Sequence, residues 1–140
     1  MNKISKFVGK NRFLSNDYMA DVIYNGILYC CNTSAFESQR STDSIIRMEF
    51  ADLSPYSAKV RGRCIETRED WNTVKEQIMM EICVQKFLQN PKLMKQLFDT
   101  GDAELINSNN YKDTYWGTYN GKGSNTLGKI LMQIREDLKV

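Results

Sequence analysis

The chain has 140 residues, of which 41% are hydrophobic and 26% are charged, so one domain of this length can bury a core without disulfides or metals. Its formal net charge is only +2, which gives no sign of the strongly basic surface that favours nucleic acids or anionic membranes. The sequence contains no histidine, which excludes Ser-His-Asp and Cys-His catalysis, histidine zinc sites and histidine proton shuttles.

The first half of the chain predicts a β-hairpin followed by helices. Two β-prone runs within residues 22–30 flank Asn25-Gly26, the strongest short hairpin signal because both residues tolerate positive φ. The helices expected next are residues 33–46, capped by Asn32 or Thr33, and residues 55–60, ended by Gly62.

The second half predicts further helices, a short strand and a long loop. The longest helix is expected to begin near Glu69, because apolar residues then recur at helical spacing up to Phe87. The remaining predicted elements are a helix between Pro91 and Gly101, a strand at residues 104–106, a loop at residues 107–125 and a last helix from about Ser124 to Leu138. These elements predict an α+β fold that is predominantly helical.

The cysteines are Cys30, Cys31, Cys64 and Cys83, and none of them forms a Cys-x-x-Cys pair. Neither a zinc ribbon nor a thioredoxin motif is therefore indicated. Two of them are adjacent, which suits no ordinary disulfide framework and is typical of reduced thiols in a cytosolic protein. The N-terminus lacks the apolar segment of a signal peptide, and no apolar run is long enough to cross a membrane. We therefore expect a cytoplasmic protein without a membrane partner.

The loop at residues 107–125 is the first place to look for a site. Loops of this length in compact domains are usually functional or disordered, and its aromatic residues argue against disorder. Within it, Asp113 lies close to Tyr115 and Trp116. An indole can stack on a base or sugar while a carboxylate balances positive charge, but a solvated Asp and a loop Trp pinned to the core explain the pattern equally well.

The end of this loop runs as Gly121-Lys122-Gly123-Ser124-Asn125 into the last helix. Free backbone N–H groups and the positive end of the helix dipole favour an anion there. The spacing is not that of a Walker A loop, and an ordinary glycine-rich turn with an Asn N-cap is the other reading.

Glu37 is a further candidate, because it lies one turn after Thr33 on the same face of the predicted helix. Next to Phe36 it can be partly buried, which would raise its pKa into the range of acid–base work. A solvated glutamate is the alternative. A basic cluster of Lys59, Arg61, Arg63 and Arg68 can similarly meet phosphates or form a solvated connection between helices.

Several short motifs between Phe13 and Leu138 agree in order and spacing with those of one family. They are Phe13-Leu14-Ser15-Asn16, Tyr24 to Tyr29, Gly62-Arg63, Arg68-Glu69-Asp70-Trp71 with Val74-Lys75 and Met79, Lys86-Phe87, Asp113-Thr114-Tyr115-Trp116-Gly117, and Gly123 to Met132 with Arg135. Together these motifs resemble the NADAR family, which is named for its link to NAD and ADP-ribose. The family includes riboflavin-intermediate N-glycosidases and enzymes that remove ADP-ribose from guanine.

The chain departs from the family pattern at identifiable positions. Asp17 stands in the opening motif, which is usually FLSNFY, in place of an aromatic residue. The family's first helix reads like E-H/A-A-F-Q-A-Q-K, and here Thr33 replaces the Glu, a carboxylate expected to be catalytic. Arg40 replaces the Lys, and it keeps the charge but cannot form an imine with ribose. Glu37 replaces a Gln one turn after Thr33 and can take over the work of the lost acid.

The resemblance implies one NADAR-like domain over residues 1–140 that acts as an N-glycosidase without cofactor or metal. The reaction would hydrolyse a C1′–N bond through an oxocarbenium-like transition state, with ADP-ribose on guanine in nucleic acid as the leading substrate and a phosphoribosyl intermediate as another. We expect Glu37 and Asp113 to be catalytic. The expected substrate contacts are Asn16, Thr33, Arg40, Arg63, Trp71, Tyr115, Trp116, Gly117, Lys122, Gly123 and Asn125.

Two other functions stay open at this point. With Thr33 and Arg40 in place of the family's reactive pair, the pocket can bind an ADP-ribose-like nucleotide without cleaving it. A small interaction module with a vestigial pocket is the third possibility.

Overall fold

The computed structural model describes residues 2–139, which form two compact units. Of the described residues, Asn16–Asn90 form one unit, and residues 2–15 together with residues 91–139 form the other. The α+β, predominantly helical fold expected from the sequence is confirmed. In chain order the elements are β1 (Lys3–Ile4), the 3₁₀ helix η1 (Gly9–Leu14), β2 (Met19–Tyr24), β3 (Ile27–Cys31), α1 (Asn32–Ser38), α2 (Ser44–Met48), α3 (Pro55–Cys64), α4 (Trp71–Gln89), α5 (Pro91–Asp99), β4 (Glu104–Leu105) and α6 (Thr126–Asp137). Within residues 2–139 no helix combines the length and apolar character needed to span a bilayer.

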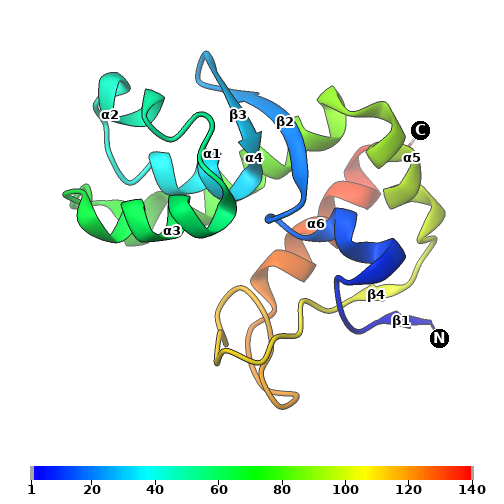
Figure 1. Ribbon diagram of the computed structural model, residues 1–140. Helices are drawn as coiled ribbons and strands as arrows, with labels where there is room; N and C mark the ends of the chain where they lie inside the picture. Colours follow the sequence, from blue (N-terminus) through cyan, green and yellow to red (C-terminus); the bar gives the residue numbers. More distant parts are fainter. Residues whose placement is uncertain (1, 140) are drawn as a thin grey trace. The chain divides into compact units, whose positions relative to one another are not determined.

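The predicted hairpin is confirmed in the unit formed by residues 16–90. β2 and β3 pair antiparallel, and Asn25 and Gly26 make the turn between them with φ of 49° and 81°. Two successive residues in the left-handed region are what a tight turn between right-twisted strands requires. The hairpin packs on α1 and α4 (Figure 1), and Val22 and Tyr29 of its strands are fully buried.

The single helix expected over residues 33–46 is wrong, because α1 and α2 are separate helices. The polar residues between them bond to the backbone locally. The N–H of Asp43 donates to Ser41 Oγ at 3.0 Å, and the N–H of Ile45 donates to Asp43 Oδ1 at 2.8 Å. Such bonds compete with a continuous helix and cap the start of a new one, so the chain turns there.

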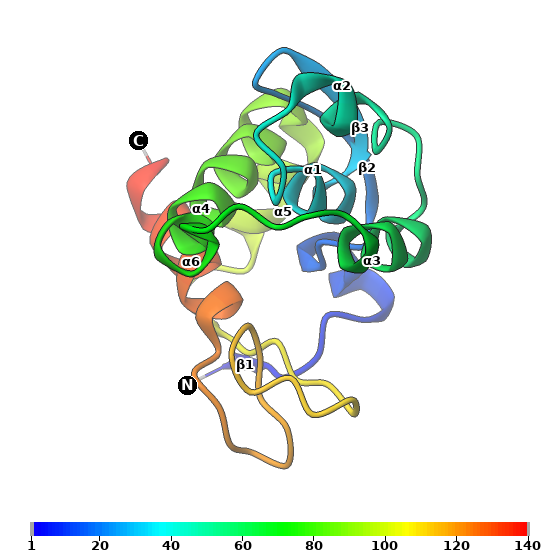
Figure 2. The same cartoon turned by 90° about the vertical axis from the view of Figure 1, so that its left-hand side faces the viewer.

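The expectation that α3 ends at Gly62 is also wrong, since the helix continues to Cys64. A Cβ atom at Gly62 would lie 2.2 Å from Oε1 of Glu37. Glycine is therefore required at this position by the close approach of α3 to Glu37 of α1, and not by helix termination. α1 and α3 lie side by side in both views of the structure (Figures 1 and 2). The longest helix, α4, begins at Trp71, close to its predicted start near Glu69.

The unit that contains both termini adds two elements that the sequence did not predict, β1 and η1. β1 pairs in parallel with β4, and a strand of two residues is too short to show a side-chain period. α5 and α6 agree with the prediction within two residues, and the chain leaves α5 through Gly101 at a φ of 64°. α6 packs on β4 (Figure 1).

The long loop predicted before the last helix is confirmed and is drawn in yellow to orange in Figure 1. Its regular pairing is limited, in the described chain, to two isolated bridges. Asn109 fixes one half of the loop, because its Nδ2 donates to the carbonyls of Asp113 and Thr118 while its Oδ1 accepts from the N–H groups of Tyr111 and Asp113. The loop is therefore held in place by its own amide side chains.

Candidate functional site

α1 carries the centre of the candidate site, and all seven of its residues are buried. It follows β3 directly, with Cys31 in the N-cap position instead of the predicted Asn32 or Thr33. The N–H of Thr33 donates to the carbonyl of Asn16 at 3.1 Å. This bond satisfies one of the N–H groups that the first turn of a helix leaves without an internal partner.

Glu37 is the buried carboxylate of this helix, with only 9% of the residue exposed. Its Oε1 accepts a hydrogen bond from Nε of Arg40 at 2.8 Å, and this ion pair is largely shielded from solvent. Gly62 of α3 lies against the same oxygen. A buried charge is costly unless it is paired and hydrogen-bonded, and Arg40 provides both.

The pKa of Glu37 is raised above its ordinary value, chiefly because burial disfavours the charged form. Arg40 opposes this rise through its charge and its hydrogen bond, and Lys59 and Arg63 oppose it through charge alone. Of the two readings that the sequence left open for Glu37, the structure therefore shows the buried carboxyl with a raised pKa and not the solvated one. A carboxyl group in this state can exchange a proton closer to neutral pH than an exposed glutamate can.

Arg40 links the carboxylate to an aromatic pair at the start of α4. Its guanidinium lies over the ring of Trp71 at 5.1 Å from the centroid, and Trp71 packs against Phe36 with ring centroids 4.9 Å apart. Trp71 is 6% exposed, so its observed contacts are those of a core residue that orients Arg40. Its predicted contact with substrate stays a prediction.

Thr33 faces a second carboxylate, Asp17, that sequence reasoning did not assign to the site. The Thr33 hydroxyl donates to Oδ1 of Asp17, and Nζ of Lys59 on α3 lies 3.1 Å from Oδ2. The signal available in the sequence was its position beside Asn16, where an aromatic residue is usual. Asp17 thus contacts α1, the helix that carries Glu37.

Asn16, a predicted contact residue, belongs to a small hydrogen-bond network at the start of α1. Its Oδ1 accepts from Nδ2 of Asn32 at 3.1 Å, and its own Nδ2 donates to the sulfur of Met79. Asn32 is 1% exposed, and its Oδ1 is the one buried side-chain polar atom of the described residues without a hydrogen-bond partner. An unsatisfied buried acceptor is costly, so this oxygen is a place where a ligand hydroxyl can donate.

The basic cluster is mostly engaged with acidic side chains of its own unit. Arg61 pairs with Glu49, and Nε of Arg68 donates to Asp70 at 2.6 Å. Arg63 is exposed, and its charge acts on the pKa of Glu37. Within this unit the structure therefore brings the predicted residues Asn16, Thr33, Glu37, Arg40, Arg63 and Trp71 onto α1 and the elements around it.

The remaining predicted residues lie in the loop and the start of α6, in the other unit. Oδ1 of Asp113 accepts from the backbone N–H groups of Tyr115 and Trp116, both at 3.0 Å. The two aromatic rings pack edge to face with centroids 4.8 Å apart. The carboxylate therefore holds the turn that presents Tyr115 and Trp116, both of which are partly exposed.

The glycines of this loop allow close backbone packing. A Cβ at Gly117 would lie 2.0 Å from the carbonyl oxygen of Asn107, and one at Gly123 would lie 2.5 Å from that of Gly117. Asn125 is 8% exposed and ties the loop to β4, since its Oδ1 accepts from the N–H of Asn107 and its Nδ2 donates to the carbonyl of Leu105.

The expectation of free N–H groups at the start of α6 is wrong. The backbone N–H groups of residues 124–127 donate to the carbonyls of Thr114, Gly117, Tyr115 and Trp116, respectively. The loop folds back over the helix start, which the local sequence does not reveal. Lys122 is exposed, and its predicted contact with phosphate, like that of Gly123, stays a prediction.

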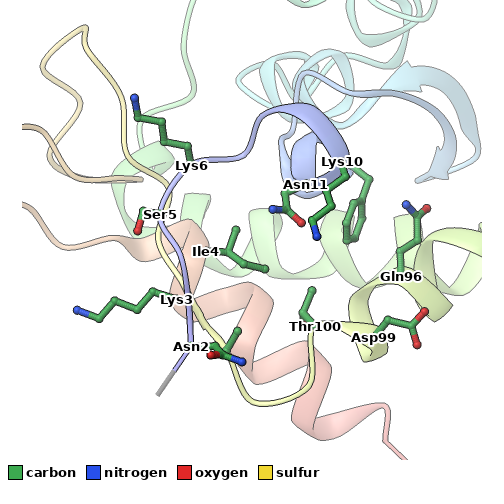
Figure 3. A pocket seen from close by; sticks show the side chains of 12 residues that line it. Asn2, Lys3, Ile4, Ser5, Lys6, Lys10, Asn11, Gln96, Asp99 and Thr100 are labelled. Carbon is green, nitrogen blue, oxygen red and sulfur yellow. The ribbon is translucent and has the colours of Figure 1, made fainter.

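The unit that contains β1, α5 and α6 has a cavity of about 580 Å³ that is lined mainly by residues of β1, η1 and α5 (Figure 3). The side chains of Lys3 and Lys6 extend away from Ile4 and Thr100 in this view. Its lining includes none of the residues predicted for the site. No group of three or more Cys, Asp or Glu side chains within residues 2–139 could hold a metal ion.

The sequence profile of the NADAR domain matches residues 3–139. The chain belongs to the NADAR domain family. The NMR structure of the Escherichia coli protein YbiA is similar to this NADAR chain with a TM-score of 0.85 and 32% identity, over 99% of this chain and 86% of YbiA. The resemblance carried by the short motifs is therefore confirmed.

Relatives of the NADAR chain carry two kinds of name. The N-glycosidase YbiA of E. coli K12 is 36% identical over 109 residues, which cover 75% of this chain and 68% of YbiA. An N-glycosidase of Nostoc punctiforme is 40% identical over 99 residues, covering 69% of this chain and 63% of that protein. A riboflavin biosynthesis protein of Vibrio vulnificus is 33% identical over 133 residues, covering 91% of this chain. The NADAR chain spans only 35% of the Vibrio protein.

The contact between Gly62 and Glu37 predicts the effect of Gly62→Ala. Alanine is the better helix former by about 1 kcal/mol, but its Cβ would overlap the Glu37 carboxyl. We expect the free energy of unfolding, measured by urea denaturation, to fall by about 1–3 kcal/mol. In a Glu37→Ala background the same substitution should be neutral or stabilising. Equal losses in both backgrounds would show that the contact does not set the cost.

Proposed function

We propose that this NADAR chain is an N-glycosidase that hydrolyses the C1′–N bond of a ribosyl substrate. The leading substrate is ADP-ribose attached to guanine in nucleic acid, and a phosphoribosyl intermediate is the other member of the class. The observation that carries the proposal is the buried Glu37 carboxylate, held by Arg40 on a helix that borders several polar groups. The relatives named N-glycosidase support the reaction class. We expect the enzyme to act in the cytoplasm, on the argument from its cysteines.

Glu37 is suited to stabilise the positive charge that develops on the ribose. Cleavage of the C1′–N bond passes through an oxocarbenium-like state, and a fixed carboxylate shielded from water stabilises such a charge most strongly. The ion pair with Arg40 fixes the orientation of the carboxylate before substrate binds. No metal or cofactor has a step in this reaction.

Each of the two units carries groups suited to part of a ligand that contains ribose, a base and phosphate. The buried Oδ1 of Asn32 can accept a hydrogen bond from a ribose hydroxyl. We assign Trp116 to stacking on the base and Asp113 to holding it, because a carboxylate accepts hydrogen bonds from the N–H groups on the edge of guanine. Arg63 and Lys122 are the cations assigned to phosphate.

The alternative function is a binder of ADP-ribose-like nucleotides that does not cleave them. The observation that favours it is the ion pair itself, because Arg40 neutralises the carboxylate that the reaction needs. Thr33 also contributes a hydroxyl where the family has a carboxylate. The two functions predict the same affinity for the nucleotide, and they differ only in whether the nucleotide is cleaved.

The test is an incubation of purified protein with ADP-ribosylated guanine in DNA and, separately, with a phosphoribosyl-pyrimidine intermediate of riboflavin synthesis. We expect mass spectrometry to detect released ADP-ribose or ribose phosphate. Glu37→Gln should lower turnover by about 10²–10³-fold, whereas Glu66→Gln, at an exposed position of the same unit, should leave it unchanged. If calorimetry shows tight binding of ADP-ribose and neither substrate gives a product, the protein is a binder and not an enzyme. Full activity of Glu37→Gln would show that Glu37 has no role in the mechanism.

The pKa of Glu37 predicts the pH dependence of this activity. The carboxylate must be ionised to stabilise the oxocarbenium ion, so kcat/KM should fall as the pH drops through a pKa that lies above the ordinary value for glutamate. Arg40 lowers this pKa, so Arg40→Gln should raise it and move the acid limb of the kcat/KM profile to higher pH. Arg61→Gln is the matched control, because Arg61 pairs with Glu49. An acid limb that stays in place in Arg40→Gln would contradict the role of Glu37.

A further inference from the structure

Asp17 is a carboxylate whose two oxygens are both held by neighbouring elements. The Thr33 hydroxyl of α1 donates to Oδ1, and the Lys59 ammonium of α3 donates to Oδ2 at 3.1 Å. A carboxylate held at both oxygens has little rotational freedom left. The Asp17 side chain is thus oriented by its two neighbours.

Asp17 lies along the same seam between α1 and α3 as Glu37. Thr33, which contacts Asp17, is one turn before Glu37 on α1, and Lys59, which also contacts Asp17, is one turn before Gly62 on α3. Gly62 in turn lies against the Glu37 carboxyl. The charge of Lys59 acts on both acids, since it pairs with Asp17 and lowers the pKa of Glu37. Figure 2 shows α1 and α3 adjacent to each other.

The two carboxylates differ in their access to water. The side chain of Asp17 is 47% exposed, whereas that of Glu37 is 11% exposed. A water molecule can reach Asp17 directly, while Glu37 is shielded by Arg40 and the packing of α3. Two carboxyl groups in such different surroundings are suited to different roles in one reaction.

We infer that Asp17 is the general base that activates the attacking water, an assignment that rests on the N-glycosidase function proposed above. In this step the water oxygen forms a bond to C1′ while the C1′–N bond breaks and its electron pair passes to the base nitrogen. One proton of the water moves to an Asp17 oxygen, and the leaving nitrogen takes up a proton from solvent. Asp17 then releases its proton to bulk water. Glu37 stabilises the charge on the ribose, and Thr33 and Lys59 are positioning residues for Asp17.

The test measures kcat and KM separately for Asp17→Asn and for the matched control Asp21→Asn, an exposed aspartate on β2 of the same unit. Asparagine keeps an oxygen that can accept from Thr33, so the fold and the affinity for ADP-ribose, measured by calorimetry, should be retained. We expect kcat of Asp17→Asn to fall by about 10²–10⁴-fold with KM changed less than about threefold. Asp21→Asn should match the wild type. In Asp17→Gly, added formate should restore turnover, because a small carboxylate can occupy the vacated space and accept the proton.

The outcomes separate this assignment from the function on which it rests. A wild-type protein that cleaves neither substrate overturns the proposed function and the role of Asp17 together. A wild-type protein that is active, with Asp17→Asn retaining more than about a third of its kcat, overturns the role of Asp17 alone. A loss of kcat in Asp17→Gly that formate does not restore assigns Asp17 a structural role and overturns its role as a base.

Discussion

The burial of the Glu37 carboxylate is the constraint on which the unit of residues 16–90 depends. A charge in the interior must be paired, or the cost of removing it from water falls on the fold. Arg40 supplies the pair three residues later on the same segment, and Trp71 supplies the surface on which the guanidinium rests. Gly62 supplies the space, since any larger residue would meet the carboxyl oxygen. The packing of α1 against α3 and α4 therefore accommodates the Glu37 carboxylate and its partner Arg40.

The same arrangement explains why the site can be reactive. Burial raises the pKa of Glu37, and the charges of Arg40, Lys59 and Arg63 limit this rise. Shifted pKa values of this kind are common where groups exchange protons or face developing charge. Stability alone gives no reason to bury an acid here, because a well-packed apolar side chain of similar size would avoid the desolvation cost.

Local signals in the sequence were enough for some features and not for others. The hairpin followed from Asn25-Gly26, because the turn is determined by the conformational freedom of these two residues. The helical spacing of Glu37 to Thr33 and its neighbour Phe36 made burial possible, but the sequence also left a solvated glutamate open, because burial depends on the packing of α3 and α4. The role of Gly62 did not follow, because a glycine that ends a helix and one that makes room for a distant side chain look alike in sequence. Asp17 was missed because its partners, Thr33 and Lys59, lie 16 and 42 positions away.

The most direct test of the account is a crystal structure of the protein with ADP-ribose bound. We predict that C1′ of the terminal ribose faces Glu37, with a carboxylate oxygen within about 3.5 Å of that carbon. ADP-ribose bound with C1′ turned away from Glu37, or held in the cavity beside β1 and α5, would contradict it.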